Sequence, residues 1–247
     1  MPNQVVLITG GGRGIGAAIA RGVAREGRVP VVVYQSRHRD AETLVSEIRR
    51  DGGHAVAVCA DVGREDDILR CFEAADREGQ LVGLVNNAGM TGGQSTVMNV
   101  SADQLGAVFN LNTVGAFICA REAVRRMAHS RGGGGGSIVN VSSAAARSGS
   151  PNFWVHYAAS KAALDTMTLG LAKEVAADGI RVNAVRPGVI DTEIHAANPP
   201  ELMERMKQVI PMRRMGRPDE VAEAVIWLLS GAASYVTGSI IDAGGGY

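Results

Sequence analysis

The sequence has few cysteines, few aromatic residues and no excess of charge of either sign. Its three cysteines, Cys59, Cys71 and Cys119, form no C-x-x-C pair, and their odd number argues against a disulfide framework. Lys plus Arg and Asp plus Glu each total 25, so no net field draws the chain to nucleic acid or to an anionic membrane. We therefore expect a cytoplasmic protein that acts on small molecules.

The sequence also lacks long hydrophobic runs and clustered metal ligands. The N-terminal stretch "MPNQVVLITGGG" is broken by glycine too soon to be a signal peptide or a membrane span. The five histidines are scattered without zinc-like spacing, so no metal site is expected. With 46% hydrophobic and 20% charged residues, the 247-residue chain has an ordinary globular composition and can bury a sizeable core.

Short runs rich in valine and isoleucine alternate along the chain with longer helical patterns. "QVVLIT" precedes a helix expected at about 14–26, and "VPVVVY" precedes one at about 40–50. Further helices are expected at about 65–78, 102–130 and 218–229 and around Tyr157. Strands that are apolar on both faces and alternate with helices predict a parallel sheet covered by helices on both sides.

Nothing in the sequence marks a domain boundary. The glycine run at 132–136 precedes the apolar strand "SIVNVSS", where a connecting loop is sufficient. We therefore expect one α/β domain over residues 1–247. The one long interruption of the alternation, at about 189–217, is expected to be a substrate loop, because long insertions in compact domains often serve that purpose.

A glycine-rich loop directly follows the first expected strand. The stretch "TGGGRGIG" (Thr9 to Gly16) places glycines at 10, 14 and 16, where strand turns into helix. Glycine there lets the backbone approach a pyrophosphate, while the helix N-terminus offers free N–H groups and a partial positive charge. The spacing G-x-x-x-G-x-G differs from the common G-x-G-x-x-G, and a glycine-rich turn without a ligand is the alternative.

The end of the second expected strand bears on the choice of cofactor. An acidic residue about 20 residues after the loop would bind the ribose 2′-hydroxyl of NAD, but Tyr34 stands in that place. Arg13 and Arg37 could instead grip a 2′-phosphate, and Ser36 could donate to it. NADP(H) is therefore favoured over NAD(H). The alternative for Arg37 is a solvated charge run at a helix start.

The stretch "HYAASKAALD" places Tyr157 four residues before Lys161 in an alanine-rich run that predicts a helix. Residues four apart share one face of a helix, so the phenol and the ammonium could act on one bound molecule. In isolation, the same pair could equally be a surface contact, and its interpretation depends on the rest of the chain.

Eight motifs in the same order make the chain resemble the short-chain dehydrogenase/reductase family over essentially its whole length. They are "TGGGRGIG" (9–16), "ADV" (60–62), "NNAG" (86–89), Asn112 in "NLNTVG", Ser143 in "NVSS", "YAASK" (157–161), "RPG" (186–188) and "SYVTGSIIDAGGG" near the end. Within this family the chain resembles the glucose 1-dehydrogenase-like and 3-oxoacyl-[acyl-carrier-protein] reductase-like members. The resemblance implies a Rossmann fold with a doubly wound, seven-stranded parallel sheet.

The resemblance also implies four catalytic residues, Asn112, Ser143, Tyr157 and Lys161. Tyr157 is implied as general acid and base on a carbonyl or alcohol oxygen, with Lys161 stabilising its phenolate. Ser143 is implied to hold the substrate oxygen, because strand alternation sends Ser142 to the other side and the family pattern selects the second serine. Asn112 is implied to hold a water that relays protons from Lys161.

The same resemblance implies which residues contact the dinucleotide. Asp61 and Val62 would lie along the adenine, residues 87–89 along the adenosine ribose, and residues 187–192 around the nicotinamide amide and the phosphates. The full set is Gly10, Gly12, Arg13, Gly14, Ile15, Gly16, Tyr34, Gln35, Ser36, Arg37, Asp61, Val62, Asn87, Ala88, Gly89, Tyr157, Lys161, Pro187, Gly188, Val189, Ile190 and Thr192.

Contacts to the substrate are expected from Ser143, Trp154, His156, Tyr157 and His195. Trp154 offers apolar area, while the two histidines could bind hydroxyls or a carboxylate. Each of these three could equally serve packing.

The expected assembly is a homotetramer, on resemblance alone, with Trp227 and Leu228 supplying apolar surface for the interface. A basic cluster, defined as Arg125, Arg126, His129 and Arg131, could attract an acidic carrier protein or be a solvated helix face.

Two classes of function therefore remain. The first is an NADP-dependent oxidoreductase acting between a carbonyl and an alcohol, and the sequence leaves open whether its substrate is a carrier-linked 3-oxoacyl group or a sugar or polyol. The second is a non-catalytic NADP-binding sensor or scaffold on the same fold. Loss of the tyrosine or the lysine would signal the second class, and both residues are present.

Overall fold

A seven-stranded parallel sheet forms the centre of the computed structural model, which describes residues 2–193 and 200–247. The strand order is β3-β2-β1-β4-β5-β6-β7, and each neighbouring pair is parallel. The strands are β1 (Gln4–Thr9), β2 (Val29–Tyr34), β3 (Val56–Cys59), β4 (Gln80–Asn86), β5 (Gly136–Val141), β6 (Ile180–Pro187) and β7 (Ile240–Ala243). The parallel sheet expected from the apolar runs is confirmed.

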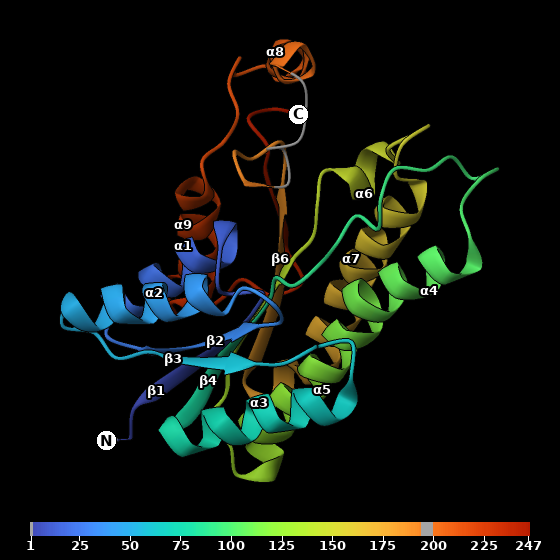
Figure 1. The fold of residues 1–247 in the computed structure, drawn as a ribbon. Coiled ribbons are helices and arrows are strands. Elements are labelled where there is room, and N and C mark those ends of the chain that lie inside the picture. The colour runs from blue at the N-terminus through green and yellow to red at the C-terminus, as the bar shows by residue number, and fades with distance from the viewer. Residues whose placement is uncertain (1, 194–199) are drawn as a thin grey trace.

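Helices cover both faces of this sheet (Figure 1). They are α1 (Gly14–Arg25), α2 (His38–Arg50), α3 (Glu65–Glu78), α4 (Ala102–Phe109), α5 (Ala116–Met127), α6 (Ala145–Ser148), α7 (Val155–Val175), α8 (Pro200–Val209) and α9 (Pro218–Leu229). Alternate residues of β1 point to opposite faces of the sheet and pack against different helix layers. Val5 and Leu7 pack with α3, α5 and α7, whereas Val6 and Ile8 pack with α1, α2 and α9.

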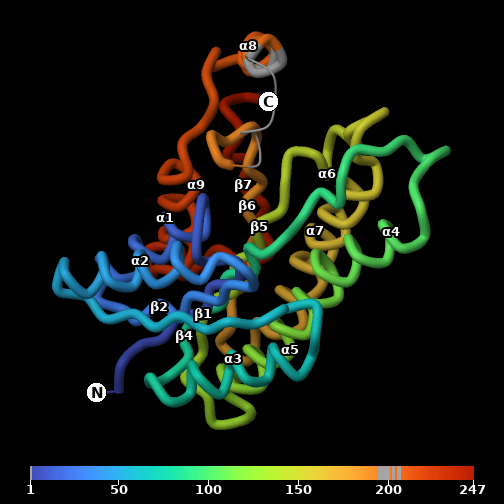
Figure 2. Tube along the Cα trace, viewed as in Figure 1, coloured from blue at the N-terminus to red at the C-terminus, as the bar shows by residue number. Residues whose placement is uncertain are grey.

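The strand order reverses at the centre of the sheet, because β1 has β2 on one side and β4 on the other. The loops that follow these strands diverge at such a point and leave room for a ligand at the carboxyl edge. Figure 2 shows α8 at the same end of the molecule as α6. Of the long segment after β6, helix α8 thus lies toward the end of the molecule where a ligand would bind.

The long helix expected at 102–130 is not continuous. A π-helical segment, Asn110–Gly115, separates α4 from α5, and a 3-10 turn at His129–Arg131 follows α5. Such widened turns are rare and often lie at functional sites. Here the chain must bring Gly115 against the β3–α3 loop, where an added Cβ would lie only 2.2 Å from the carbonyl oxygen of Val62.

One expected interface residue lies in the core instead. The side chain of Leu228 is 0% exposed, whereas Trp227, its neighbour on α9, is 41% exposed. Successive residues of a helix point about 100° apart, so only one of the two can face outward here. Leu228 therefore supplies no surface to a partner.

Within the described residues, none of the helices has the length and apolar character needed to cross a membrane.

Candidate active site

A cleft of about 1120 Å³ lies at the carboxyl edge of the sheet, at the point where the strand order reverses. Pockets for small molecules measure about 300–1,000 Å³, so this cleft has room for a dinucleotide and a substrate together. Every residue that the sequence assigned to the dinucleotide lines it, as do Ser143 and Trp154. The fold brings these residues together from segments spread over most of the chain.

The glycine-rich loop forms one wall of the cleft and is shaped to admit a phosphate. Gly14 has a φ of 52°, in the left-handed region that side chains rarely adopt. A Cβ on Gly16 would lie 2.2 Å from the carbonyl oxygen of Gly10, so the tight turn excludes any larger residue. In the described structure no side chain caps the N-terminus of α1, and its first turn carries no acidic residue. Its free N–H groups and partial positive charge suit a pyrophosphate.

Thr9, which the sequence analysis missed, fastens this loop to the next one. Its hydroxyl accepts hydrogen bonds from the backbone N–H groups of Asn87 and Ala88, both at 3.0 Å. In return, the Asn87 side chain donates to the carbonyl oxygens of Thr9 and Gly10, both at 2.9 Å. A threonine that ends a strand carries no special signal in sequence. Its role depends on the pairing of β1 with β4.

Tyr157 and Ser143 meet on the opposite wall of the cleft. Tyr157 lies in the first turn of α7, and Ser143 follows the end of β5. Burial raises the pKa of the Tyr157 phenol, and a hydrogen bond with the side chain of Ser143 partly lowers it. The hydroxyl of Ser142 instead donates to the carbonyl oxygen of Lys161 at 3.1 Å. Of the two serines, Ser143 is the one that interacts with the phenol.

Lys161 lies one helical turn after Tyr157 and is buried, with 3% of its surface exposed. Its Nζ donates to the carbonyl oxygen of Val141 at 2.8 Å and lies 5.9 Å from the centre of the Tyr157 ring. Burial lowers the pKa of this amine to about 8, although the nearby carboxylate of Asp165 acts in the opposite direction. The amine can therefore change its charge near neutral pH.

Asn112, in the π-helical segment, clamps the loop after β4. Its Oδ1 accepts from the backbone N–H of Met90, and its Nδ2 donates to the carbonyl oxygen of Met90, both at 2.9 Å. Its Nδ2 also donates to the Ser160 hydroxyl at 2.9 Å. Asn112 is fully buried and is not among the residues that line the cleft. Its side chain thus positions Met90, and the expected role in a proton relay stays a prediction.

The expected substrate residues do not all reach the cleft. Trp154 does, and its buried indole N–H has no hydrogen-bond partner among the described residues. His156 does not: it is 5% exposed, and its Nε2 lies 2.9 Å from the carbonyl oxygen of Thr91. One residue before Tyr157, it points to a different side of α7 and serves packing, which corrects the expected substrate contact. His195 lies outside the described residues.

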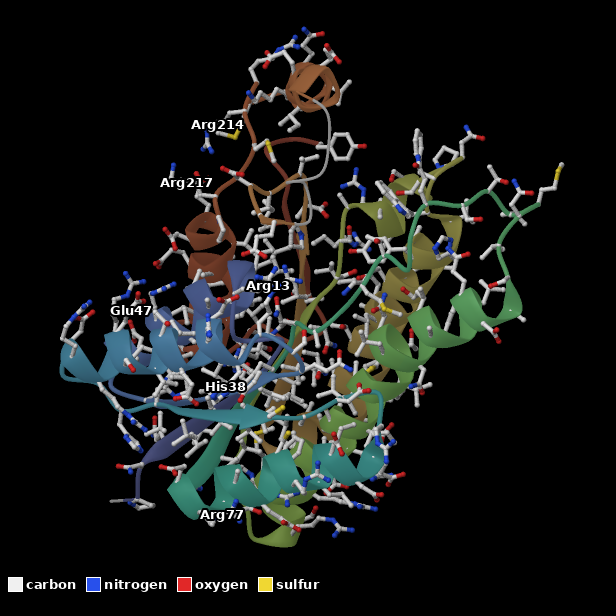
Figure 3. All side chains as sticks on the ribbon, viewed as in Figure 1. Arg13, His38, Glu47, Arg77, Arg214 and Arg217 are labelled. Atoms are coloured by element: carbon white, nitrogen blue, oxygen red, sulfur yellow. The ribbon has the colours of Figure 1, made fainter. Side chains whose placement is uncertain are left out.

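One end of the cleft, called the adenosine end because the adenosine is expected there, carries the charged groups expected to discriminate between cofactors. Arg13 stands at the start of α1 (Figure 3), and Ser36 and Arg37 follow β2. Tyr34 is buried, and its hydroxyl lies 2.6 Å from Nδ1 of His38. Glu193, a further residue of this wall that the sequence analysis missed, contacts both arginines. No spacing rule links a loop after β6 to arginines near the N-terminus, so only the fold reveals it.

Comparison with known proteins agrees with this geometry. A family model described as enoyl-(acyl carrier protein) reductase matches residues 10–247. The chain is 50% identical to the uncharacterized oxidoreductase YgfF of Escherichia coli over 98% of this chain and 99% of that protein. It is 37% identical to an NADPH-dependent aldehyde reductase-like chloroplastic protein of Arabidopsis thaliana, over 100% of this chain and 95% of that one.

The two expected subfamilies are both present among the relatives. Glucose 1-dehydrogenase 2 of Bacillus subtilis and a 3-oxoacyl-[acyl-carrier-protein] reductase of Synechocystis are each 36% identical to the chain, over 100% and 98% of its length and 95% and 96% of theirs. The crystal structure of a dehydrogenase/reductase from Sinorhizobium meliloti superposes with a TM-score of 0.92 at 32% identity, covering 100% of this chain and 95% of that one. The chain therefore belongs to the short-chain dehydrogenase/reductase family of oxidoreductases, which bind a nicotinamide cofactor.

Proposed function

We propose that this oxidoreductase uses NADP(H) to interconvert a carbonyl group and a secondary alcohol of a small molecule, with Tyr157 as the general acid and base. The observation that supports this most is the meeting of Ser143, Tyr157 and Lys161 at the cleft that also contains the glycine-rich loop. A nicotinamide cofactor, when bound, gives or accepts the hydride. The chain itself must supply the proton and stabilise the oxygen.

Each of the three side chains has a definite task in this proposal. In the reductive direction, negative charge develops on the carbonyl oxygen, and the Tyr157 hydroxyl delivers a proton to it. Ser143 donates a hydrogen bond to the same oxygen and holds it beside the phenol. The positive charge of Lys161 stabilises the phenolate and so opposes the burial that raises the pKa of Tyr157. In the oxidative direction the phenolate accepts the alcohol proton.

The side chains around the cleft favour a broad class of substrate. Trp154 contributes an apolar wall to the cleft. The basic cluster gives little support to an acidic carrier protein, because Arg125 and Arg126 each pair with Glu122 and Arg126 also pairs with Asp76. A free carbonyl compound, such as a keto sugar, an aldehyde or a diketone, is therefore favoured over a carrier-linked 3-oxoacyl group.

The test is the loss of NADPH absorbance with a panel of carbonyl compounds, with NADH in parallel. The panel contains acetoacetyl thioesters, keto sugars, diketones, and aromatic aldehydes and ketones. Reduction of one class by NADPH, but not by the Tyr157→Phe variant, would support the proposal and name the substrate class. Tight binding of NADPH without turnover of any compound would instead favour the non-catalytic sensor.

The preference for NADPH should depend on Arg37. Replacing Arg37 by alanine removes a guanidinium from the proposed 2′-phosphate site, and hydrogen bonds to charged groups typically contribute about 1.5–3 kcal/mol. Because the side chain is 54% exposed, we expect the smaller loss of about 5- to 10-fold in NADPH affinity, with NADH affinity unchanged. Isothermal titration calorimetry measures both. Arg39→Ala, an exposed neighbour outside the cleft, is the matched control. An equal loss for both cofactors would contradict the NADP assignment.

A further inference from the structure

One carboxylate oxygen joins the two arginines of the adenosine end. Oε2 of Glu193 accepts from Nη1 of Arg13 at 2.9 Å and from Nη2 of Arg37 at 2.8 Å. The three residues come from three separate loops, after β1, after β2 and after β6. All of them line the cleft. Residues 180 and 156 positions apart in the chain are therefore linked through a single oxygen.

This arrangement reproduces what a bound phosphate oxygen would do. Guanidinium groups bind carboxylates and phosphates with the same N–H donors and similar distances. Among the described residues, the only other carboxylate paired with Arg37 is that of Asp40, at the longer distance of 3.5 Å. Glu193 thus occupies the donors that the NADP proposal assigns to the 2′-phosphate.

The carboxylate and a 2′-phosphate cannot share these donors without a penalty. A phosphate monoester carries about −1.5 to −2 charges at neutral pH, and a carboxylate bound to the same two nitrogens would lie close to it. Like charges at such a distance repel. Either the phosphate displaces the carboxylate or it binds with its own contacts weakened. A cofactor without the phosphate meets neither problem.

We propose that Glu193 is a cofactor-specificity residue that competes with the 2′-phosphate for Arg13 and Arg37, and so lowers affinity for NADP(H) while leaving NAD(H) unaffected. This inference rests on the proposed NADP site. The three side chains are 48%, 54% and 51% exposed, so the competition is screened by solvent and salt. We expect Glu193→Gln to tighten NADPH binding about 3- to 10-fold at low salt, and less at high salt.

The experiment compares ligands that differ only in the 2′-phosphate. Dissociation constants are measured by calorimetry for adenosine 2′,5′-bisphosphate against 5′-AMP, and for NADPH against NADH, with the wild type, Glu193→Gln and Glu193→Ala. The control is Glu223→Gln, because Glu223 also pairs with an arginine, Arg25, at 2.9 Å but does not line the cleft. Tighter binding of only the two 2′-phosphorylated ligands by both Glu193 variants is expected. Unchanged or weaker binding of these ligands would overturn the inference.

The arginine variant separates failure of this inference from failure of the NADP assignment. If Arg37→Ala weakens only the 2′-phosphorylated ligands and the Glu193 variants change nothing, the NADP site stands and the competition does not. If Arg37→Ala affects both kinds of ligand equally, the NADP site itself fails. Combining Glu193→Gln with Arg37→Ala should leave less of the gain seen with Glu193→Gln alone, because two residues that share a contact are not additive.

Discussion

Replacing Tyr157 by phenylalanine should lower the turnover number by about 10²- to 10⁴-fold, the range typical of a lost general acid. The substitution removes only the hydroxyl, so the ring that lines the cleft is kept. We therefore expect NADPH affinity and the free energy of unfolding to change little. Stopped-flow or steady-state reduction of the responding carbonyl, together with calorimetry for NADPH, measures the two effects separately.

A control variant and the pH dependence of turnover test whether the Tyr157 phenol is the proton donor. Tyr235→Phe removes a phenol that is fully exposed and should leave turnover unchanged. Because burial raises the pKa of Tyr157, the protonated acid persists at neutral pH, so reduction should be fast there and decline at alkaline pH. Oxidation needs the phenolate and should rise with pH. The phenol would be excluded as the proton donor if Tyr157→Phe kept near-normal turnover, or if the substitution left the pH dependence of turnover unchanged.

Replacing Lys161 by methionine should abolish turnover and stabilise the protein in the absence of cofactor. The folded-state pKa of about 8 lies below the 10.5 of a free lysine, so the unfolded chain binds this proton more tightly. The resulting penalty is fully present below pH 8 and disappears as the pH rises from 8 through 10.5. Such a shift corresponds to about 3 kcal/mol, from which loss of the hydrogen bond to Val141 subtracts about 1.

We therefore expect Lys161→Met to raise the free energy of unfolding by about 2 kcal/mol at pH 7. At pH 10.5 little of the penalty remains, so the lost hydrogen bond should leave this free energy unchanged or slightly lower. Urea denaturation of the cofactor-free protein at both pH values measures this. The matched control is Lys173→Met, which changes an exposed lysine on the same helix and should have little effect at either pH. Two results would contradict the presence of a buried ammonium that destabilises the fold. One is a methionine variant less stable than the wild type at pH 7, and the other is an equal rise in the free energy of unfolding at both pH values.

The layered fold was predictable because its signals are local. Apolar runs such as "VPVVVY" become buried strands, since each lies between two helix layers and must be apolar on both faces. The glycine-rich loop was predictable for a similar reason. The spacing of its glycines indicates a tight backbone turn that only glycine allows, as at Gly16.

The errors concern residues whose environment depends on distant partners. The π-helical segment at Asn110–Gly115 follows from contacts of Asn112 with Met90 and of Gly115 with Val62, which no helical propensity encodes. His156 was assigned to the substrate because its ring could bind a hydroxyl or a carboxylate, but its place on the helix turns it toward Thr91. Glu193 was overlooked because its arginine partners lie at the other end of the chain.

The position of β1 in the middle of the sheet has a consequence for how the protein is made. Its neighbour β2 and the glycine-rich loop leave the ribosome more than a hundred residues before Tyr157, Lys161 and strand β6. Parallel strands joined by long crossovers pair slowly, because the entropy cost of bringing distant segments together comes before their contacts can stabilise them. A nascent chain thus carries the turn proposed to bind phosphate long before it carries the tyrosine proposed to move a proton. In the proposed mechanism, catalytic competence therefore has to wait for α7 and β6.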